Sequence, residues 1–381
     1  MRKLLKILGK TVAIFFLLIL SLIAIQYALC PIYTFPPPEP FSGKYWYNPY
    51  ADLSPNWYKA NFHAHTISWL GFTDAKDTKE ELIEHYKKLG YDLIGISNYM
   101  RITPLDTTEL IDFRVYEHGY NMKKRHHLAL NAENVDWRDY LLWQNLNHKQ
   151  HMINILKRSS EVLALAHPRY YHGFSPEDMK YLTGYDFVEV LNHYKKSILI
   201  WDAALSSGRI GWILGDDDTH NTQKSKSTGV CWTMINSPVK SKTAILATMK
   251  AGHTIGVTGK HGFMDNQLQR FTVNTTHLTI QFREPVNKII FIGQKGEIRD
   301  EREHTDSASL KLLPSDTYIR TVAYTDSCTL YLNPVFRYNG ESIPRPQAEV
   351  DWLKTWLQRM VILFLFGFLL VVYIKKIRRK K

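Results

Sequence analysis

The amino-acid sequence predicts an α/β domain followed by a small all-β sandwich domain, with a membrane-spanning helix at each end of the chain. Three observations lead to this fold class. Short apolar runs alternate with helical patterns over residues 57–262, which is typical of α/β domains, barrels among them. From residue 263 the hydrophobic period becomes two, as in half-buried strands. A long apolar run beside basic residues lies near each terminus.

The first apolar run predicts a transmembrane helix over residues 11–29, behind a basic tail at residues 1–10. This run has no charged residue and would be about 28 Å long as a helix, close to the thickness of the bilayer core. A cleaved signal peptide is the alternative, although its apolar region usually has only about 7–15 residues. The second run predicts a span at residues 356–374, followed by a basic tail at residues 375–381. A buried C-terminal helix is the alternative there, but that tail is almost entirely basic.

The positive charge of the chain is concentrated in these two tails. The 381 residues include 48 Lys and Arg against 36 Asp and Glu, which gives a net charge of +12. The tails hold four and six basic residues and no acid, so the remainder carries only +2. This near-neutral remainder argues against a nucleic-acid-binding face. Because basic flanks stay in the cytoplasm, we expect a plasma-membrane (inner-membrane) protein with both termini cytoplasmic and its domains extracytoplasmic, on the periplasmic side in a Gram-negative cell.

The region between the spans divides into three parts. Residues 30–56 begin with a proline-rich run, which predicts an extended, semi-rigid stalk. In the α/β region, 57–262, the expected helices are 79–89 and 141–156, and the expected strands are 91–97, 163–167, 187–191 and 212–215. In the β-sandwich region, 263–349, the expected strands are 271–282, 288–293 and 317–324.

Histidines and acids gather at strand ends in the α/β region. His63 and His65 are two positions apart, so on a strand they point the same way and can bind one metal ion. Asp218 and His220 repeat this spacing inside a run of three acids, which repel one another unless a cation neutralises them. The remaining candidates are Glu117, His126 with His127 as the other choice, and His167. Each motif alone has an ordinary explanation, as a packing histidine, a solvated turn or a strand cap, but together they favour a metal site.

As a set, these residues resemble the PHP (polymerase and histidinol phosphatase) superfamily of metal-dependent phosphoesterases, in a membrane-anchored bacterial form. The matching motifs follow in order between residues 60 and 220: His63-Ala64-His65-Thr66, Glu117, His126, Ala166-His167-Pro168, Val188-Glu189-Val190 with Asn192, and Asp218-Thr219-His220. The resemblance implies a distorted (β/α)7 barrel that holds two or three divalent metal ions, Zn, Mn or Fe. It also adds Asp74 as a ligand and makes Glu117 the bridging carboxylate.

One segment departs from the family pattern. Asn98 and Tyr99 stand where family members usually have Asp-His. Asn98 offers no anionic ligand, and a neutral tyrosine is a poor one. The alternatives are the loss of one metal, its weaker binding, or a contact between Tyr99 and the substrate.

The resemblance and the two spans together predict a membrane-anchored phosphoesterase. Metal-activated water would hydrolyse a small phosphomonoester or phosphodiester, with Glu117, Asp218 and Arg169 as catalytic residues. Arg169 is included because it is the basic residue nearest to His167 in the sequence. The alternatives are a 5′-3′ exonuclease or oligonucleotide phosphatase, which the low charge disfavours, and a sensing or scaffold module that binds metal without catalysis. No protein partner is indicated.

Overall fold

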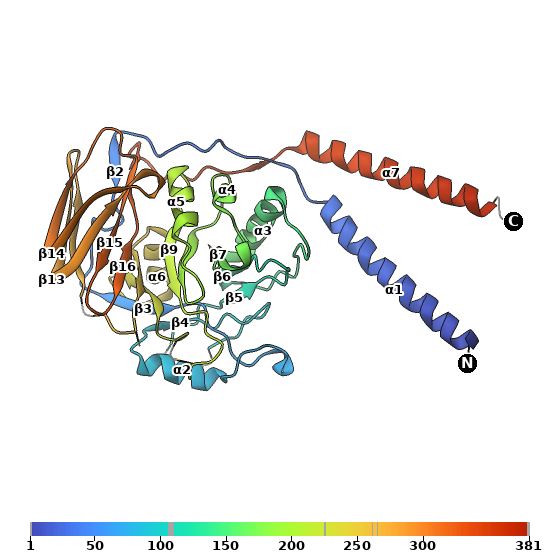
Figure 1. The fold of residues 1–381 in the computed structure, drawn as a ribbon, viewed down its shortest axis with the longest axis horizontal. Coiled ribbons are helices and arrows are strands. Elements are labelled where there is room, and N and C mark those ends of the chain that lie inside the picture. Colours follow the sequence, from blue (N-terminus) through green and yellow to red (C-terminus); the bar gives the residue numbers. More distant parts are fainter. Residues whose placement is uncertain (1, 106–109, 225, 261, 265, 379–381) are drawn as a thin grey trace.

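The computed structural model describes residues 2–105, 110–224, 226–260, 262–264 and 266–378. They form a mixed α/β body with sheets of two, eleven and five strands (Figure 1). Two long helices at the chain ends, α1 (Arg2–Ala28) and α7 (Trp352–Arg378), extend from the same side of this body (Figure 1).

The five-stranded sheet has the order β5-β6-β7-β8-β9. Its first three strands are antiparallel neighbours, whereas β7, β8 and β9 run parallel. The strands are β5 (Tyr116–His118), β6 (His127–Ala132), β7 (Ser160–Leu165), β8 (Phe187–Asn192) and β9 (Trp212–Asp216). The helices between them are α3 (Leu146–Ser159), α4 (Pro176–Met179) and α5 (Ile198–Ser206).

The eleven-stranded sheet joins segments from both predicted domains. Its main path is β12-β13-β15-β16-β11-β10-β3-β4, with β14, β17 and β2 attached at its side. The strands are β2 (Tyr45–Tyr47), β3 (Trp57–Asn61), β4 (Leu93–Ile94), β10 (Cys231–Asn236), β11 (Thr254–Thr258), β12 (Leu268–Val273), β13 (His277–Ile292), β14 (Ile298–Lys311), β15 (Tyr318–Tyr324), β16 (Thr329–Leu332) and β17 (Val335–Tyr338). Helix α2 (Lys79–Lys88) connects β3 to β4, and α6 (Lys242–Lys250) connects β10 to β11.

Two isolated bridges join the large sheets to each other. Ala64, just after β3, pairs with Thr219, just after β9, and Tyr99, after β4, pairs with Glu117 in β5. The distorted (β/α)7 barrel of the prediction is not shown, because these junctions are single bridges and β5, β6 and β7 are antiparallel. What the structure does show is a mixed α/β fold with several sheets.

The two buried cores divide differently from the predicted domains. One core surrounds the five-stranded sheet and includes Leu163 and Trp212. The second combines Trp232 of β10 with Phe271 and Phe291 of the C-terminal strands. Residues on both sides of position 263 therefore share a sheet and a hydrophobic core. Burial of their apolar side chains stabilises the two predicted domains together.

Several predicted elements are confirmed, and others differ in their boundaries. Helix α2 begins with a capping box, in which Thr78 accepts from the Glu81 amide and the Glu81 side chain accepts from Thr78. The expected helix 141–156 begins only at Leu146, because Asn145 caps it there. The expected strand 271–282 is wrong as one element, since a turn after Val273 divides it between β12 and β13.

The segment between α1 and β3 is extended and lies along the body. Strand β1 (Tyr33–Thr34) pairs with β18 (Glu349–Val350), and β2 pairs with β17. The Arg209 guanidinium donates to the carbonyls of Pro36 and Pro37, while Phe41 stacks on Phe336. These contacts tie the proline-rich segment to the body along its length.

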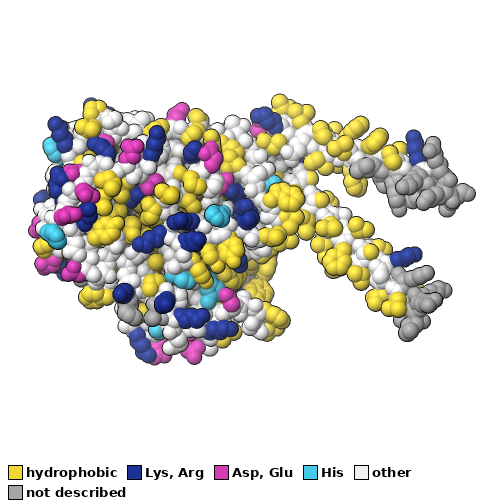
Figure 2. All heavy atoms as spheres, in the orientation of Figure 1, with side chains coloured by type: hydrophobic (Ala, Val, Ile, Leu, Met, Phe, Trp, Pro, Cys, Tyr) yellow, Lys and Arg dark blue, Asp and Glu magenta, His cyan; other side chains and the backbone are white. Residues whose placement is uncertain are grey.

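Helix α1 contains one stretch that is long and apolar enough to cross a membrane, Ile7–Ala28. Most of its described side chains are exposed, and Figure 2 shows them as a continuous hydrophobic surface. Such a helix near an N-terminus is also compatible with a signal sequence. Within the second predicted span, the side chains of residues 369–370 and 373–374 lie outside the described set, so α7 stays a predicted span.

Candidate metal centre

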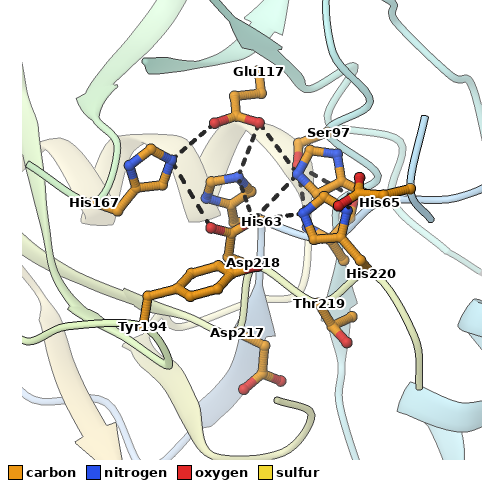
Figure 3. Close-up of polar contacts among 12 residues, drawn as sticks. His63, His65, Ser97, Glu117, His167, Tyr194, Asp217, Asp218, Thr219 and His220 are labelled. Carbon is orange, nitrogen blue, oxygen red and sulfur yellow. Dashed lines mark hydrogen bonds and ion pairs between the residues drawn. The ribbon is translucent and has the colours of Figure 1, made fainter. Parts of the chain in front are cut away.

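The predicted ligands come together where the two large sheets meet. His63 and His65 follow β3, Glu117 lies in β5, His167 follows β7 and Asp218 follows β9. The His65 amide donates to the Thr219 carbonyl, and the Asp218 amide donates to the His63 carbonyl. These backbone bonds hold the two sheet ends side by side, so the ligand side chains project into one space (Figure 3).

Four buried atoms converge at the centre of this space. The His63 Nε2 lies 3.4 Å from Glu117 Oε2 and 3.2 Å from Asp218 Oδ1. The His65 Nε2 lies 3.2 and 3.3 Å from the same two oxygens. All four atoms are buried without a hydrogen-bond partner. Buried polar atoms are almost always satisfied, so four orphaned ligand atoms in contact fit a cation between them.

Glu117 connects this group of atoms to a second pair of imidazoles. Its other oxygen, Oε1, lies 2.5 Å from His126 Nδ1 and 3.0 Å from His167 Nε2. Asp218 also reaches this side, with Oδ2 at 3.9 Å from His167 Nε2. A carboxylate with each oxygen facing a different pair of imidazoles has the geometry of a ligand that bridges two metal ions.

A third group lies at the outer edge of the cluster. His220 is mostly buried and stacks on His65, with ring centroids 4.3 Å apart. Its Nε2 lies 3.5 Å from Asp218 Oδ1, and its Nδ1 lies 2.9 Å from Asp74 Oδ1. The Asp74 side chain is 75% exposed, so this acid reaches the cluster through His220.

The charges of the cluster depend on one another. Burial alone lowers the pKa of His63, but the carboxylates of Asp218, Glu189 and Glu117 outweigh it and raise that pKa well above its usual value. Burial likewise opposes ionisation of Glu117, yet the imidazoles of His126 and His63 hold its pKa well below the usual range. The carboxylates are therefore anionic and attract positive charge, which a divalent ion supplies more effectively than protonated histidines.

Two of the ligands have unusual backbone conformations. His167 has a φ of 28° and Asp218 a φ of 51°, and residues that carry a Cβ rarely adopt positive φ values. Each is the second residue after the end of its strand, where the chain turns and the side chain joins the cluster. Strain of this kind, at about 1–3 kcal/mol per residue, is typical of functional sites.

A carboxylate that was not among the predicted site residues orients His63. The buried Glu189 accepts from His63 Nδ1 at 3.0 Å, which leaves Nε2 as the ligand atom. Glu189 also accepts from the His167 amide and from Asn192 Nδ2. The signal in the sequence was an acid inside the apolar strand Phe187–Asn192, since a buried carboxylate requires partners.

The three acids of the 216–218 run have separate roles. Only Asp218 faces the ligands, and Figure 3 shows Asp217 pointing away from them. Asp217 accepts from Tyr86 Oη and from the Gly229, Val230 and Cys231 amides. Asp216 accepts from the Phe62 amide. Of the three acids, Asp218 alone was predicted as a ligand, and the other two carboxylates connect β9 to the neighbouring chain.

Other predicted residues lie outside the cluster. His127, the alternative to His126, faces the opposite side of β6 and packs on His118 and Phe174. The Arg169 side chain is exposed and donates to the Lys196 carbonyl, and no contact among the described residues joins it to the ligands. Its catalytic role therefore stays a prediction.

The Asn98-Tyr99 departure has a clear structural role. The Asn98 amide donates to Thr66 Oγ1 and Thr103 Oγ1 and accepts from the Thr66 amide, so it supports the His63–Thr66 segment. The Tyr99 ring stacks on His65 at 4.5 Å. Burial, followed by the nearby carboxylates of Glu117 and Asp218, raises the pKa of Tyr99, so its phenol stays neutral. Neither residue supplies an anionic ligand.

Taken together, the fold and the site define a mixed α/β protein with a buried histidine-carboxylate cluster suited to divalent metal ions. Neither a protein-family model nor a curated protein matches the chain. Among solved structures, it is similar to a two-domain protein from Bacteroides vulgatus described as containing a predicted PHP-like metal-dependent phosphoesterase. The identity is 11% and the TM-score 0.40, over 83% of this chain and 97% of that one. This score is too low to establish a shared fold, so function has to rest on the geometry of the site.

Proposed function

We propose that this protein is a membrane-anchored, metal-dependent phosphoesterase with a two-metal centre. The observation that supports this proposal most strongly is the set of four orphaned ligand atoms around one point, with Glu117 reaching from there to His126 and His167. Imidazole and carboxylate ligands suit Zn, Mn or Fe. Two such ions, when bound, activate a water molecule and stabilise the phosphoryl oxygens during in-line attack.

The residues around the ligands position them for this chemistry. Glu189 fixes His63 with Nε2 toward the metal position, and Asn192 Nδ2 lies 3.3 Å from Asp218 Oδ2. The cluster is buried, so few water molecules compete with the attacking one. Among the described residues, Lys124 brings a basic side chain to this region, with Nζ 5.7 Å from the Tyr99 ring centroid. We therefore prefer Lys124 to Arg169 as the residue that attracts the substrate phosphate.

The membrane arrangement is part of the proposal. Helices α1 and α7 leave the same side of the body (Figure 1), and the basic residues near each terminus lie at the ends of these helices that point away from it. If both cross the membrane, both tails lie in the cytoplasm and the metal centre lies outside it. The substrate is then an extracytoplasmic phosphomonoester or phosphodiester.

Metal content tests the proposal directly. Full-length protein in detergent is reconstituted with Zn, Mn or Fe(II), and bound metal is measured together with hydrolysis of p-nitrophenyl phosphate and bis(p-nitrophenyl) phosphate. We expect about two equivalents of metal and measurable turnover. The double variant His63→Ala/His65→Ala should lose metal and turnover.

The matched control is His172→Ala/His277→Ala, which removes two exposed histidines from outside the cluster. It should keep both the metal and the activity. Equal metal binding by the two double variants, or an absence of metal in the wild type, would contradict the proposal.

One alternative has structural support. Asn98 uses its amide entirely within the fold, and Tyr99 is neutral, so the centre has fewer anionic ligands than the family pattern supplies. A sensing or scaffold module would bind metal in the same experiment without hydrolysing either phosphoester.

A further inference from the structure

A group of exposed apolar side chains lies beside the metal centre. In the loop between β3 and α2, Leu70 and Phe72 are 99% and 90% exposed. Met122, Trp137 and Trp143 expose more than half of their surface, and Trp69 and Tyr120 somewhat less. We call these seven residues the aromatic surface. Large apolar side chains exposed together mark an interaction site rather than ordinary surface.

Contacts connect the aromatic surface to α1. Tyr27, near the C-terminal end of α1, lies 5.7 Å from the Trp143 ring and accepts from the Leu142 amide. The Met122 amide donates to the Leu141 carbonyl, which brings Met122 to the same edge. The loop that precedes α2 extends toward the side from which α1 and α7 leave (Figure 1). Hydrophobic side chains gather at this edge beside the base of α1 (Figure 2).

Contacts also connect the aromatic surface to the metal centre. Trp137 packs edge-on against Trp69, with ring centroids 5.8 Å apart. The Trp69 indole donates to the Tyr99 carbonyl at 2.8 Å, and the Tyr99 ring stacks on His65. Trp137 is therefore connected to the ligand His65 through Trp69 and Tyr99.

A pocket opens between these side chains. Its volume is about 500 Å³, and its lining includes Trp69, Tyr99, Tyr120, Lys124 and Trp137. Its walls are mainly aromatic and apolar, while the Lys124 ammonium provides one positive charge. This combination accommodates a molecule with an apolar body and an anionic head.

We infer that the aromatic surface lies on the lipid bilayer and that the substrate is a phosphoester carried by a membrane lipid. This inference rests on the proposed function and extends it to a substrate class. Tryptophan and tyrosine are enriched where a membrane meets water, and basic residues such as Lys123 and Lys124 attract anionic headgroups. Helix α1 anchors the body beside the bilayer, so a lipid headgroup can reach the pocket while its acyl chains stay in the membrane.

A spin label measures the position of the surface independently of activity. All native cysteines are buried, so a nitroxide attaches selectively to Leu70→Cys. In vesicles of phosphatidylcholine and phosphatidylglycerol, this label should be more accessible to oxygen than to a water-soluble nickel chelate. The control is Leu199→Cys on α5, where the side chain is 70% exposed, and it should show the opposite preference. Equal accessibility at the two positions would overturn membrane contact.

Hydrolysis then tests the substrate class with full-length protein in vesicles. The lipid substrates are phosphatidic acid and phosphatidylglycerol, and the soluble ones are the two p-nitrophenyl phosphoesters. Leu70→Ser/Phe72→Ser should lower lipid hydrolysis at least about tenfold, because less apolar surface enters the membrane, and should leave soluble turnover unchanged. The control, Leu199→Ser/Val239→Ser, alters exposed apolar residues elsewhere and should keep both activities.

The outcomes separate the inference from the proposed function. Wild-type turnover of soluble phosphoesters alone would overturn the lipid substrate and leave the phosphoesterase standing. Equal loss of both activities in Leu70→Ser/Phe72→Ser would mean that the loop shapes the centre itself, which also overturns the inference. Turnover of neither class would overturn the proposed function and the lipid substrate together.

Discussion

At the scale of single residues, the carboxylates and imidazoles of the cluster shift one another's pKa values. Glu117 and Asp218 are buried anions whose pKa values are held low by imidazoles. The same carboxylates raise the pKa of His63. Without a cation, protons on the histidines take its place. A metal ion has to displace those protons, so its affinity depends on groups that orient the imidazoles as well as on the ligands.

Glu189→Gln tests this dependence. The variant keeps the size of the side chain but weakens the carboxylate interaction with His63 Nδ1, so metal affinity should fall about 10–100-fold. Competition with a metal chelator measures the change. Glu161→Gln, on β7 and partly exposed, is the control and should bind metal like the wild type. Unchanged affinity in Glu189→Gln would show that His63 is oriented by the fold alone.

At the scale of elements, the centre depends on strand ends and on the helices that pack behind them. Helix α3 lies between β6 and β7 and buries Met152, Ile153 and Leu156. On the side facing the N-terminal segment it also carries a buried histidine, His148, and a half-buried one, His151. His151 Nδ1 contacts Tyr33 Oη at 3.0 Å, and burial, followed by the charges of Arg138 and Arg158, lowers its pKa to about 4.

This lowered pKa makes stability depend on pH. An unfolded histidine has a pKa of about 6.5, so below that value the unfolded chain binds a proton that the folded chain does not. Stability should therefore fall as pH decreases from about 6.5 toward 4. After allowance for solvent screening, His151 should account for about 1 kcal/mol of the loss between pH 7 and pH 5.

Thermal unfolding of full-length protein in detergent at the two pH values measures this loss. His151→Gln retains a hydrogen-bonding group for Tyr33 and removes the titration, so its unfolding midpoint should change less with pH. An identical pH dependence in the variant and the wild type would rule out His151 as the cause.

At the scale of the whole molecule, contacts between the two ends of the chain determine where the apolar helices begin. Strand β1 pairs with β18, and the Ile32 amide donates to Thr355 Oγ1 in the first turn of α7. The Gln358 side chain donates to the Ala28 carbonyl at the end of α1. The C-terminal end of α1 and the N-terminal end of α7 therefore lie side by side. If both helices cross a membrane, both termini lie on the same side of it.

Reporter fusions in bacterial cells test this topology. Green fluorescent protein fused to either terminus should fluoresce, and alkaline phosphatase fused there should be inactive, because both ends are expected in the cytoplasm. Alkaline phosphatase inserted at Thr275, in the exposed turn between β12 and β13, should be active. An active phosphatase at only one terminus would show that a single helix crosses the membrane or that the first is cleaved.

The candidate site was more predictable from the sequence than the arrangement of the sheets. His63 and His65 follow from the two-residue period of a strand, and Asp218 and His220 repeat it, so local spacing is enough to propose them. The role of Glu189 needed the structure, because its partner His63 is 126 residues away. The same is true of Trp69 and Trp137, which meet only through loop conformations.

The sequence by itself determined the α/β and β composition, the apolar character of the two end helices, and most of the residues that meet in the buried histidine-carboxylate cluster. These features depend on local periodicity and composition, which neighbouring residues specify. Only the tertiary structure decided that the C-terminal strands extend a sheet from the α/β region, and that two single bridges join that sheet to the other beside the ligands. It also decided that Asp216 and Asp217 accept from the neighbouring chain instead of facing the cluster. Such outcomes depend on pairing and packing between residues far apart in the chain, which no local pattern specifies.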